Sequence, residues 1–124
     1  MKIKIKNIVL ADGEEEVIEQ IHDGQVVEKN GWIYLTYVDE EGFKNVIKLN
    51  DESLMLTRFA EQNTKMNFIL GQAEATIMTP VGVQFLTTDT SKFEKNGNHV
   101  KIDYSLNQNN FKFADYKLEI EFDL

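Results

Sequence analysis

The sequence contains no cysteine and only one proline, Pro80, and both scarcities limit what the chain can be. Without cysteine it forms no disulfide, uses no thiolate nucleophile and binds no zinc through sulfur ligands. A chain without cysteine also fits a reducing compartment, so we expect a cytoplasmic protein. Because proline cannot donate a ladder hydrogen bond, a single proline held in a turn favours strands along much of the remaining chain.

Positive charge and long apolar runs are scarce as well. Lysine and arginine total 13 residues against 21 aspartates and glutamates, so the net charge is −8. Such an acidic surface opposes binding to nucleic-acid phosphates and to anionic membrane surfaces. No apolar run reaches the length of a membrane span, and residues 1–6 alternate lysine with isoleucine as a strand does, unlike a signal peptide. We therefore expect neither nucleic acid nor a membrane as a partner.

What the chain does contain is a succession of short strands and tight turns, clearest at residues 73–88. There, two runs rich in Val, Ile, Thr and Phe flank a turn in which Pro80 suits the second position and Gly82 the last. The pairs Asn30-Gly31 and Asn96-Gly97 are further hairpin signals. Apolar and polar residues alternate between most of these turns, which predicts about ten antiparallel strands.

Residues 14–29 can be read in two ways from their local pattern. Val17, Ile18 and Ile21 have helical spacing, which favours a short helix. Gly24 and the β-branched pair that follows it favour a strand. The local pattern leaves both structures open.

Two other stretches interrupt the alternation of apolar and polar residues. The phase of the first strand becomes unclear at residues 8–10, and the phase of the last strand switches at residues 114–115. An extra residue in one strand produces such a switch, so we expect a β-bulge at each place.

The predicted fold class is all-β, an antiparallel up-and-down meander in one domain, residues 1–124. An open sheet of so many consecutive strands leaves two exposed edges, and closure into a barrel removes them. We therefore predict a closed barrel of about eight to ten strands.

Several turns and strand aromatics also carry a family resemblance that covers nearly the whole chain. They are Lys29-Asn30-Gly31, Tyr34-Leu35-Thr36-Tyr37, Arg58-Phe59 and Thr79-Pro80-Val81-Gly82. With these features the chain resembles the YwiB-like family of small uncharacterised bacterial proteins, a domain of unknown function with a calycin-like, lipocalin-like β-barrel. The resemblance implies that Glu14–Lys29 is one long strand, which we expect to be kinked at Gly24. It implies no activity, although calycin-like barrels elsewhere bind small ligands. One departure from the family pattern is Ala60, where a glycine is expected shortly after the arginine.

Four residues are candidates for a ligand site inside the barrel: Arg58, Met66, Phe68 and Tyr104. Counted from Leu54 and Leu56, the single arginine falls on an apolar phase, where its guanidinium would hold a carboxylate or phosphate. Met66, Phe68 and Tyr104 would contact the apolar part of such a ligand. The alternative is that Arg58 lies at a barrel end, paired with an acidic residue. The main functional hypothesis is thus a binder of a small apolar or amphipathic anionic ligand.

The alternative function is a protein–protein interaction module, with a homodimer as one form. Trp32–Val38 is apolar or aromatic on both faces, and Trp32, Tyr34 and Tyr37 are its candidate contact residues. The two histidines lack the spacing of a metal site, and the acidic clusters at residues 14–16 and 39–41 lack the pattern of a calcium loop. We therefore expect no catalytic residues, no metal and no cofactor, and not an enzyme.

Overall fold

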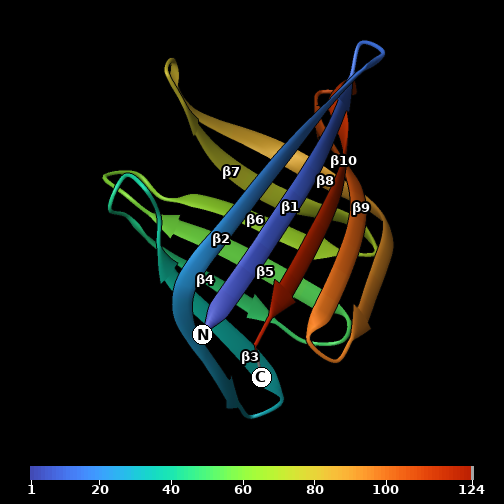
Figure 1. The fold of residues 1–124 in the computed structure, drawn as a ribbon. Helices are drawn as coiled ribbons and strands as arrows, with labels where there is room; N and C mark the ends of the chain where they lie inside the picture. Colours follow the sequence, from blue (N-terminus) through green and yellow to red (C-terminus); the bar gives the residue numbers. More distant parts are fainter. Residues whose placement is uncertain (124) are drawn as a thin grey trace.

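A computed structural model describes residues 1–123, and these residues form a closed antiparallel barrel of ten strands (Figure 1). The all-β prediction is confirmed. Within residues 1–123, no helix is long and apolar enough to cross a membrane. The strands are β1 (Lys2–Ala11), β2 (Glu14–Lys29), β3 (Trp32–Val38), β4 (Lys44–Leu49), β5 (Ser53–Phe59), β6 (Thr64–Ile69), β7 (Gly71–Thr79), β8 (Gly82–Asn96), β9 (His99–Gln108) and β10 (Phe111–Phe122).

Each strand pairs with its neighbours in the sequence, and β1 pairs with β10 to close the barrel. In such a meander the turns alternate between the two ends of the barrel. Both chain termini lie at one end, which we call the terminal end (Figure 1). The opposite end carries the turns after β1, β3, β5, β7 and β9, and we call it the mouth end.

Residues 14–29 form one strand, β2, so the strand reading is confirmed and the helical spacing is misleading. Asp12 and Gly13 form the turn before it, both with positive φ. Gly24 sits where β2 passes from its pairing with β1 to its pairing with β3. A Cβ at Gly24 would collide with the carbonyl oxygen of Thr36 and lie 2.7 Å from Cδ1 of Ile3, so only glycine allows this approach.

The bulge predicted at residues 8–10 is wrong, whereas the one predicted in the last strand is confirmed. β1 pairs without a register shift with both β2 and β10. Its alternation is hidden because Asn7 is a polar residue on the inner face, while Ile8 and Leu10 are apolar residues on the outer face. In β10 the register shifts between Lys112 and Ala114, close to the predicted phase switch.

The packed core fills the terminal end of the barrel. Its fully buried side chains come from strands around the whole barrel, and they include Ile3, Leu35, Leu49, Leu54, Val100, Ile102 and Phe122. Most of them lie close to the chain termini or to the turns at that end. Packing therefore closes the terminal end and leaves the interior nearer the mouth end for a cavity.

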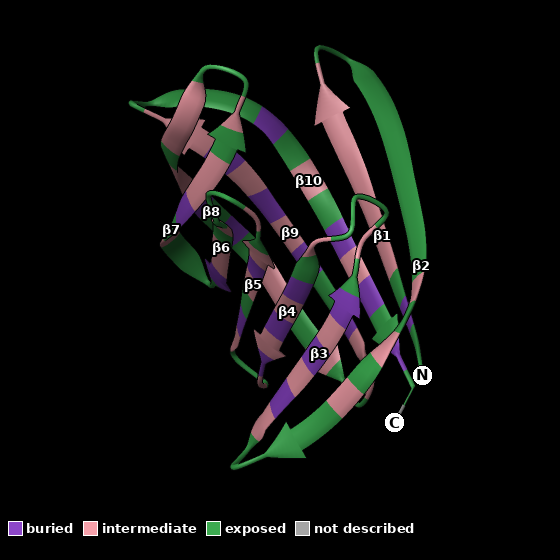
Figure 2. Ribbon diagram, turned by 90° about the vertical axis from the view of Figure 1, so that its left-hand side faces the viewer, coloured by how far each residue is buried: buried purple, intermediate pink, exposed green. Residues whose placement is uncertain are grey.

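The first half of β2 has one edge without a neighbouring strand. Residues 14–23 pair with β1, but pairing with β3 begins only at Gly24. Figure 2 shows this half of β2 exposed along almost its whole length, with β3 reaching only its lower part. The barrel is therefore open to solvent beside residues 14–23.

Candidate ligand-binding cavity

The barrel interior contains a cavity of about 250 Å³ between the packed core and the mouth end. Inner-face residues of β1–β6, β9 and β10 surround it, because alternate residues of every strand point inward. Two lining residues, Asn7 and Gln20, carry amide side chains. The others are apolar or aromatic: Ile5, Ile18, Tyr37, Ile47, Leu54, Leu56, Met66, Phe68, Tyr104, Leu118 and Ile120.

A cluster of three aromatic rings lies on one side of this cavity. The ring of Tyr104 stacks on Tyr116 at 4.8 Å between centroids, and it meets the ring of Phe68 edge-on at 4.6 Å. Both geometries are favourable for aromatic pairs. The cluster holds Phe68 and Tyr104 in fixed orientations, so this wall of the cavity is formed before any ligand arrives.

The lining includes the amide side chain of Asn7, which is not fully hydrogen-bonded. Its Oδ1 atom is buried and has no hydrogen-bond partner among the described residues. Burial raises the pKa of the nearby Tyr104 hydroxyl, and the amide of Asn7 opposes that rise. An unpaired buried acceptor is costly. Asn7 therefore presents the cavity with an acceptor that a ligand donor can satisfy.

The cavity reaches the surface beside β2. Ile18 lines the cavity, yet 42% of this residue is exposed to solvent. Gln20 lines the cavity too and also lines a second depression of about 280 Å³ at the mouth end. A small molecule can therefore enter past the unpaired edge of β2.

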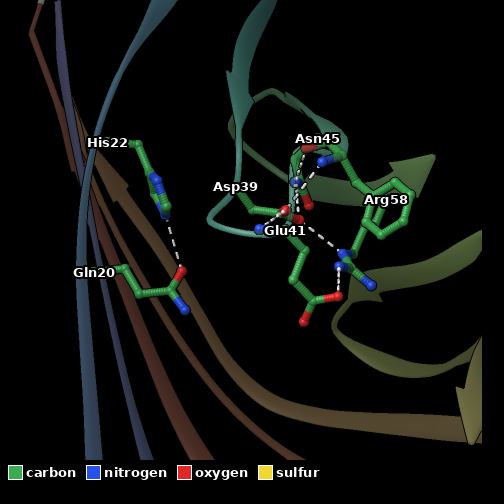
Figure 3. A network of polar contacts seen from close by, with 7 residues as sticks. Gln20, His22, Asp39, Glu41, Asn45 and Arg58 are labelled. Carbon is green, nitrogen blue, oxygen red and sulfur yellow. Dashed lines mark hydrogen bonds and ion pairs between the residues drawn. The ribbon is translucent and has the colours of Figure 1, made fainter. Parts of the chain in front are cut away.

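Arg58 lies in the second depression and is held by carboxylates (Figure 3). Its Nε atom donates to Oδ2 of Asp39 at 2.7 Å, and one of its terminal nitrogens donates to Glu41 at 3.1 Å. The guanidinium also lies over the ring of Phe43 at 4.7 Å. The positive charge of Arg58 is therefore already neutralised by two carboxylates and is not free to bind an anionic ligand.

Asp39 is the centre of this network. Besides Arg58, it accepts hydrogen bonds from the Asn45 amide at 2.9 Å and from the backbone N–H groups of Glu41 and Phe43. These donors, Arg58 first, hold the pKa of Asp39 well below its usual value. Asp39 in turn raises the pKa of Arg58. The network thus fixes the turn between β3 and β4 against β5 at the mouth end.

Tyr37 forms the wall that the cavity and the second depression share. Its ring stacks on His22 at 4.2 Å between centroids. His22 Nε2 in turn lies 3.0 Å from Gln20 Oε1 (Figure 3). Burial raises the pKa of Tyr37 to about 12, and the nearby Asp39 carboxylate contributes to this rise. The hydroxyl of Tyr37 is therefore neutral at physiological pH.

The structure brings three of the four predicted ligand residues together. Met66, Phe68 and Tyr104 all line the cavity, while Arg58 lies at the mouth end, outside its lining. Arg58 does lie on the same face of β5 as Leu54 and Leu56, but it is the penultimate residue of that strand and so lies at the mouth end of the barrel.

Asn7, Ile18 and Gln20 line the cavity but are absent from the sequence prediction. Asn7 shares the parity of Ile3 and Ile5, so strict alternation along β1 would have found it. Ile18 and Gln20 become inner residues only once β2 is known to be a strand.

The three predicted interface residues lie on different faces of β3. Tyr37 is buried inside the barrel, whereas Trp32 and Tyr34 are half-buried on the outer face. The ammonium group of Lys48 lies 4.4 Å from the Trp32 ring centroid and 5.8 Å from that of Tyr34. Trp32 and Lys48 also line an outer groove of about 410 Å³.

Within residues 1–123, no three or more His, Asp or Glu side chains are grouped so that they could hold a metal ion. The polar groups that line the cavity are the amides of Asn7 and Gln20 and the hydroxyls of Tyr37 and Tyr104.

Comparison with known proteins places the chain in a family. Residues 3–120 match the family described as Domain of unknown function (DUF1934). The chain belongs to this family. Its structure is similar to the crystal structure of the ywiB protein from Bacillus subtilis, with a TM-score of 0.72 and 19% sequence identity over 99% of this chain and 91% of that one. The predicted resemblance to the YwiB-like family is confirmed, and at this identity the structural likeness concerns the fold. No curated protein matches the chain.

Proposed function

We propose that this protein binds a small, uncharged and mainly apolar molecule that donates a hydrogen bond to Asn7 inside the barrel. The observation that carries the proposal is the apolar cavity of about 250 Å³ with one unpaired buried acceptor, Asn7 Oδ1. The role is binding, without a chemical step.

The size of the cavity supports a ligand of about one ring. An apolar cavity of about 150 Å³ is large enough for benzene, and sites for drug-sized ligands begin at about 300 Å³. A substituted ring or a short-chain alcohol falls between these sizes. A barrel of ten strands is also wider than one of eight. Side chains can just fill the interior of an eight-stranded barrel, so ten strands leave more room for a ligand.

The charges at the mouth end favour an uncharged ligand over an anionic one. Arg58 already pairs with Asp39 and Glu41, and Glu40 lies in the same depression. An anion entering there would meet carboxylates whose charge exceeds that of the single guanidinium. A neutral donor group can reach Asn7 without that repulsion.

Isothermal calorimetry with three closely matched probes tests the proposal. p-Cresol carries a hydroxyl donor, toluene lacks it, and 4-methylbenzoate replaces it with an anion. We expect p-cresol to bind about tenfold more tightly than toluene, and 4-methylbenzoate to bind most weakly. In Asn7→Leu the advantage of p-cresol over toluene should disappear. Equal binding of p-cresol and toluene to the wild-type protein would contradict the role of Asn7.

Two methionines provide a matched control for the location of the site. Met66 lines the cavity, and Met55 on the adjacent strand faces outward and is 41% exposed. Met66→Trp should fill the cavity and abolish binding of p-cresol, whereas Met55→Trp should leave it unchanged. Loss of binding in both variants, or in neither, would place the ligand elsewhere.

A second candidate function is self-association through the outer face of β3. The outer groove places Met55 and Ile69, 41% and 44% exposed, beside Trp32. Exposed apolar side chains gathered around an aromatic residue are typical of protein contacts. Sedimentation velocity should then show a dimer that Trp32→Glu dissociates. A monomer at every concentration tested would exclude this function.

A further inference from the structure

The unpaired edge of β2 at residues 14–23 is a place where another strand can pair. An edge strand presents a row of free backbone N–H and C=O groups, and native proteins usually protect it with charged side chains (lysine above all), with proline or with a bulge. Residues 14–23 contain no lysine and no proline, and their pairing with β1 has no register shift. The charges that this edge carries are carboxylates, which oppose pairing with an acidic strand and favour pairing with a basic one.

The backbone groups that point outward from this edge can be identified. Gly24 N donates to Met1 O at 2.9 Å and Met1 N donates to Gly24 O at 3.1 Å, so Gly24 belongs to a hydrogen-bonded pair with β1. Such pairs alternate along an antiparallel ladder. The even-numbered residues of this half therefore bond to β1. The free N–H and C=O groups belong to Glu15, Val17, Glu19 and Ile21, whereas Asp23 lies where the ladder with β3 begins.

The charge of the edge indicates what kind of strand it accepts. Residues 14–23 carry Glu14, Glu15, Glu16, Glu19 and Asp23, with no lysine or arginine. A second copy of this chain would bring the same carboxylates opposite these, and like charges facing each other across a ladder are destabilising. Lysines or arginines at those positions would instead form cross-strand ion pairs.

The opposite edge of β2 already holds a strand with that pattern. β1 alternates Lys2, Lys4 and Lys6 with isoleucines, and Lys2 Nζ lies 2.7 Å from Asp23 Oδ1. Lys6 stands opposite Glu19 in the same register. Val17 and Ile21 on the outer face of this half of β2 are 47% and 64% exposed, and Ile18 on its inner face is 42% exposed, so a partner strand has apolar surface to cover on both faces.

We propose that residues 14–23 of β2 bind an extended basic segment of a partner protein, in which lysine or arginine alternates with apolar residues, as an added β-strand. Main-chain hydrogen bonds would supply affinity, and the row of glutamates would select the basic sequence. The added strand would lie beside the opening of the cavity, since Ile18 and Gln20 also line it. The proposal does not depend on what the cavity binds.

Fluorescence anisotropy with labelled eight-residue peptides tests the proposal. One peptide alternates lysine with valine, and the control has the same composition as four lysines followed by four valines. We expect the alternating peptide to bind about tenfold more tightly, because only it presents valines and lysines at strand spacing. Equal affinity for the two peptides would reduce the interaction to diffuse charge attraction and overturn the proposal.

Two variants at one position separate backbone pairing from side-chain effects. Val17→Pro removes a free N–H and leaves the ladder with β1 intact, whereas Val17→Ala keeps that N–H. Val17→Pro should weaken binding about tenfold and Val17→Ala far less. The double variant Glu15→Gln/Glu19→Gln alters no backbone group and should lower both affinity and its salt dependence. Circular dichroism checks the fold of each variant. If both Val17→Pro and the double variant bound the alternating peptide with wild-type affinity, the proposal would be overturned.

Amide hydrogen exchange identifies the edge directly. On adding the alternating peptide, the amides of Glu15, Val17, Glu19 and Ile21 should exchange more slowly, and those of the even-numbered residues should not change. Unchanged exchange at the odd-numbered residues would overturn the proposal. So would protection of the same amides in a dimer without peptide, which would make a second copy the occupant.

Discussion

At the scale of single residues, two polar side chains at inner-face positions differ in their hydrogen bonding: one is paired within the protein and the other is not. Arg58 is surrounded by acceptors, and its charge is used within the protein. Asn7 lies near the Tyr104 hydroxyl in a mainly apolar lining, and its Oδ1 atom has no hydrogen-bond partner among the described residues. The paired, partly buried guanidinium of Arg58 therefore stabilises the fold. The unpaired oxygen of Asn7 carries a desolvation cost that a ligand donor would remove.

The Asp39 carboxylate should make the protein less stable in acid. Arg58 holds the folded-state pKa of Asp39 below its usual 3.8, so as the pH falls the unfolded chain takes up this proton first. The stabilisation is therefore complete at neutral pH and is lost as the pH falls from about 5 through the folded-state pKa. Asp39→Asn should lower the free energy of unfolding at pH 7 by about 1 kcal/mol, a modest value because Arg58 is partly solvated.

Urea unfolding of the wild type and Asp39→Asn from pH 7 to pH 2 measures this difference, which should shrink steadily below pH 5. Asp23→Asn is the matched control, because the ion pair of Asp23 with Lys2 is exposed to solvent. Its effect at pH 7 should be much smaller. A constant difference between wild type and Asp39→Asn over the whole pH range would show that the carboxylate charge contributes nothing.

At the scale of elements, the path of β2 depends on the close approach of its backbone to Thr36 and Ile3 at Gly24. Gly24→Ala should lower the free energy of unfolding by about 2 kcal/mol, because its Cβ would displace the Thr36 carbonyl and the Ile3 side chain. Chemical denaturation followed by Trp32 fluorescence measures the loss.

Gly13→Asn is the control for this glycine substitution. Gly13 has a φ of +75°, which asparagine tolerates, and an added Cβ there meets no atom within 4 Å. The variant should change the free energy of unfolding by about 0.5 kcal/mol or less. If Gly24→Ala were equally mild, the two strands could separate locally without cost and the close approach would not fix the path of β2.

The elements were largely predictable from the sequence because their turns are strong local signals. Asn30-Gly31 and the turn at Pro80 and Gly82 appear where they were expected, and the strand order follows from hairpin after hairpin. The error in β1 arose at Asn7, where the residue that interrupts the apolar phase is itself part of the cavity wall.

The cavity could be predicted only in part, since it depends on which inner residues of eight strands meet across the barrel. The pairing of Arg58 with Asp39 joins residues on different strands, and no local pattern selects that partner.

At the scale of the whole molecule, closure makes the β1–β10 seam equivalent to the other ladders. The seam runs in register from Ile3 opposite Phe122 to Leu10 opposite Asp115. At the terminal end, Asp123 N donates to Lys2 O at 3.1 Å and Lys2 N donates to Asp123 Oδ2 at 2.8 Å. Lys2 and Asp123 are therefore held as close together as paired residues of a hairpin.

A circular permutant should consequently retain the barrel. Joining the two chain ends with a short Gly/Ser linker turns β10 and β1 into a hairpin, and opening the chain at Val81, 85% exposed in the β7–β8 turn, breaks no ladder. We expect cooperative urea unfolding, with a loss of about 2 kcal/mol or less. A second permutant opened at Asp103, between the buried Ile102 and Tyr104, should show no cooperative transition because it divides β9. Failure of the Val81 permutant alone to fold would mean that the β7–β8 hairpin must be continuous for the barrel to close.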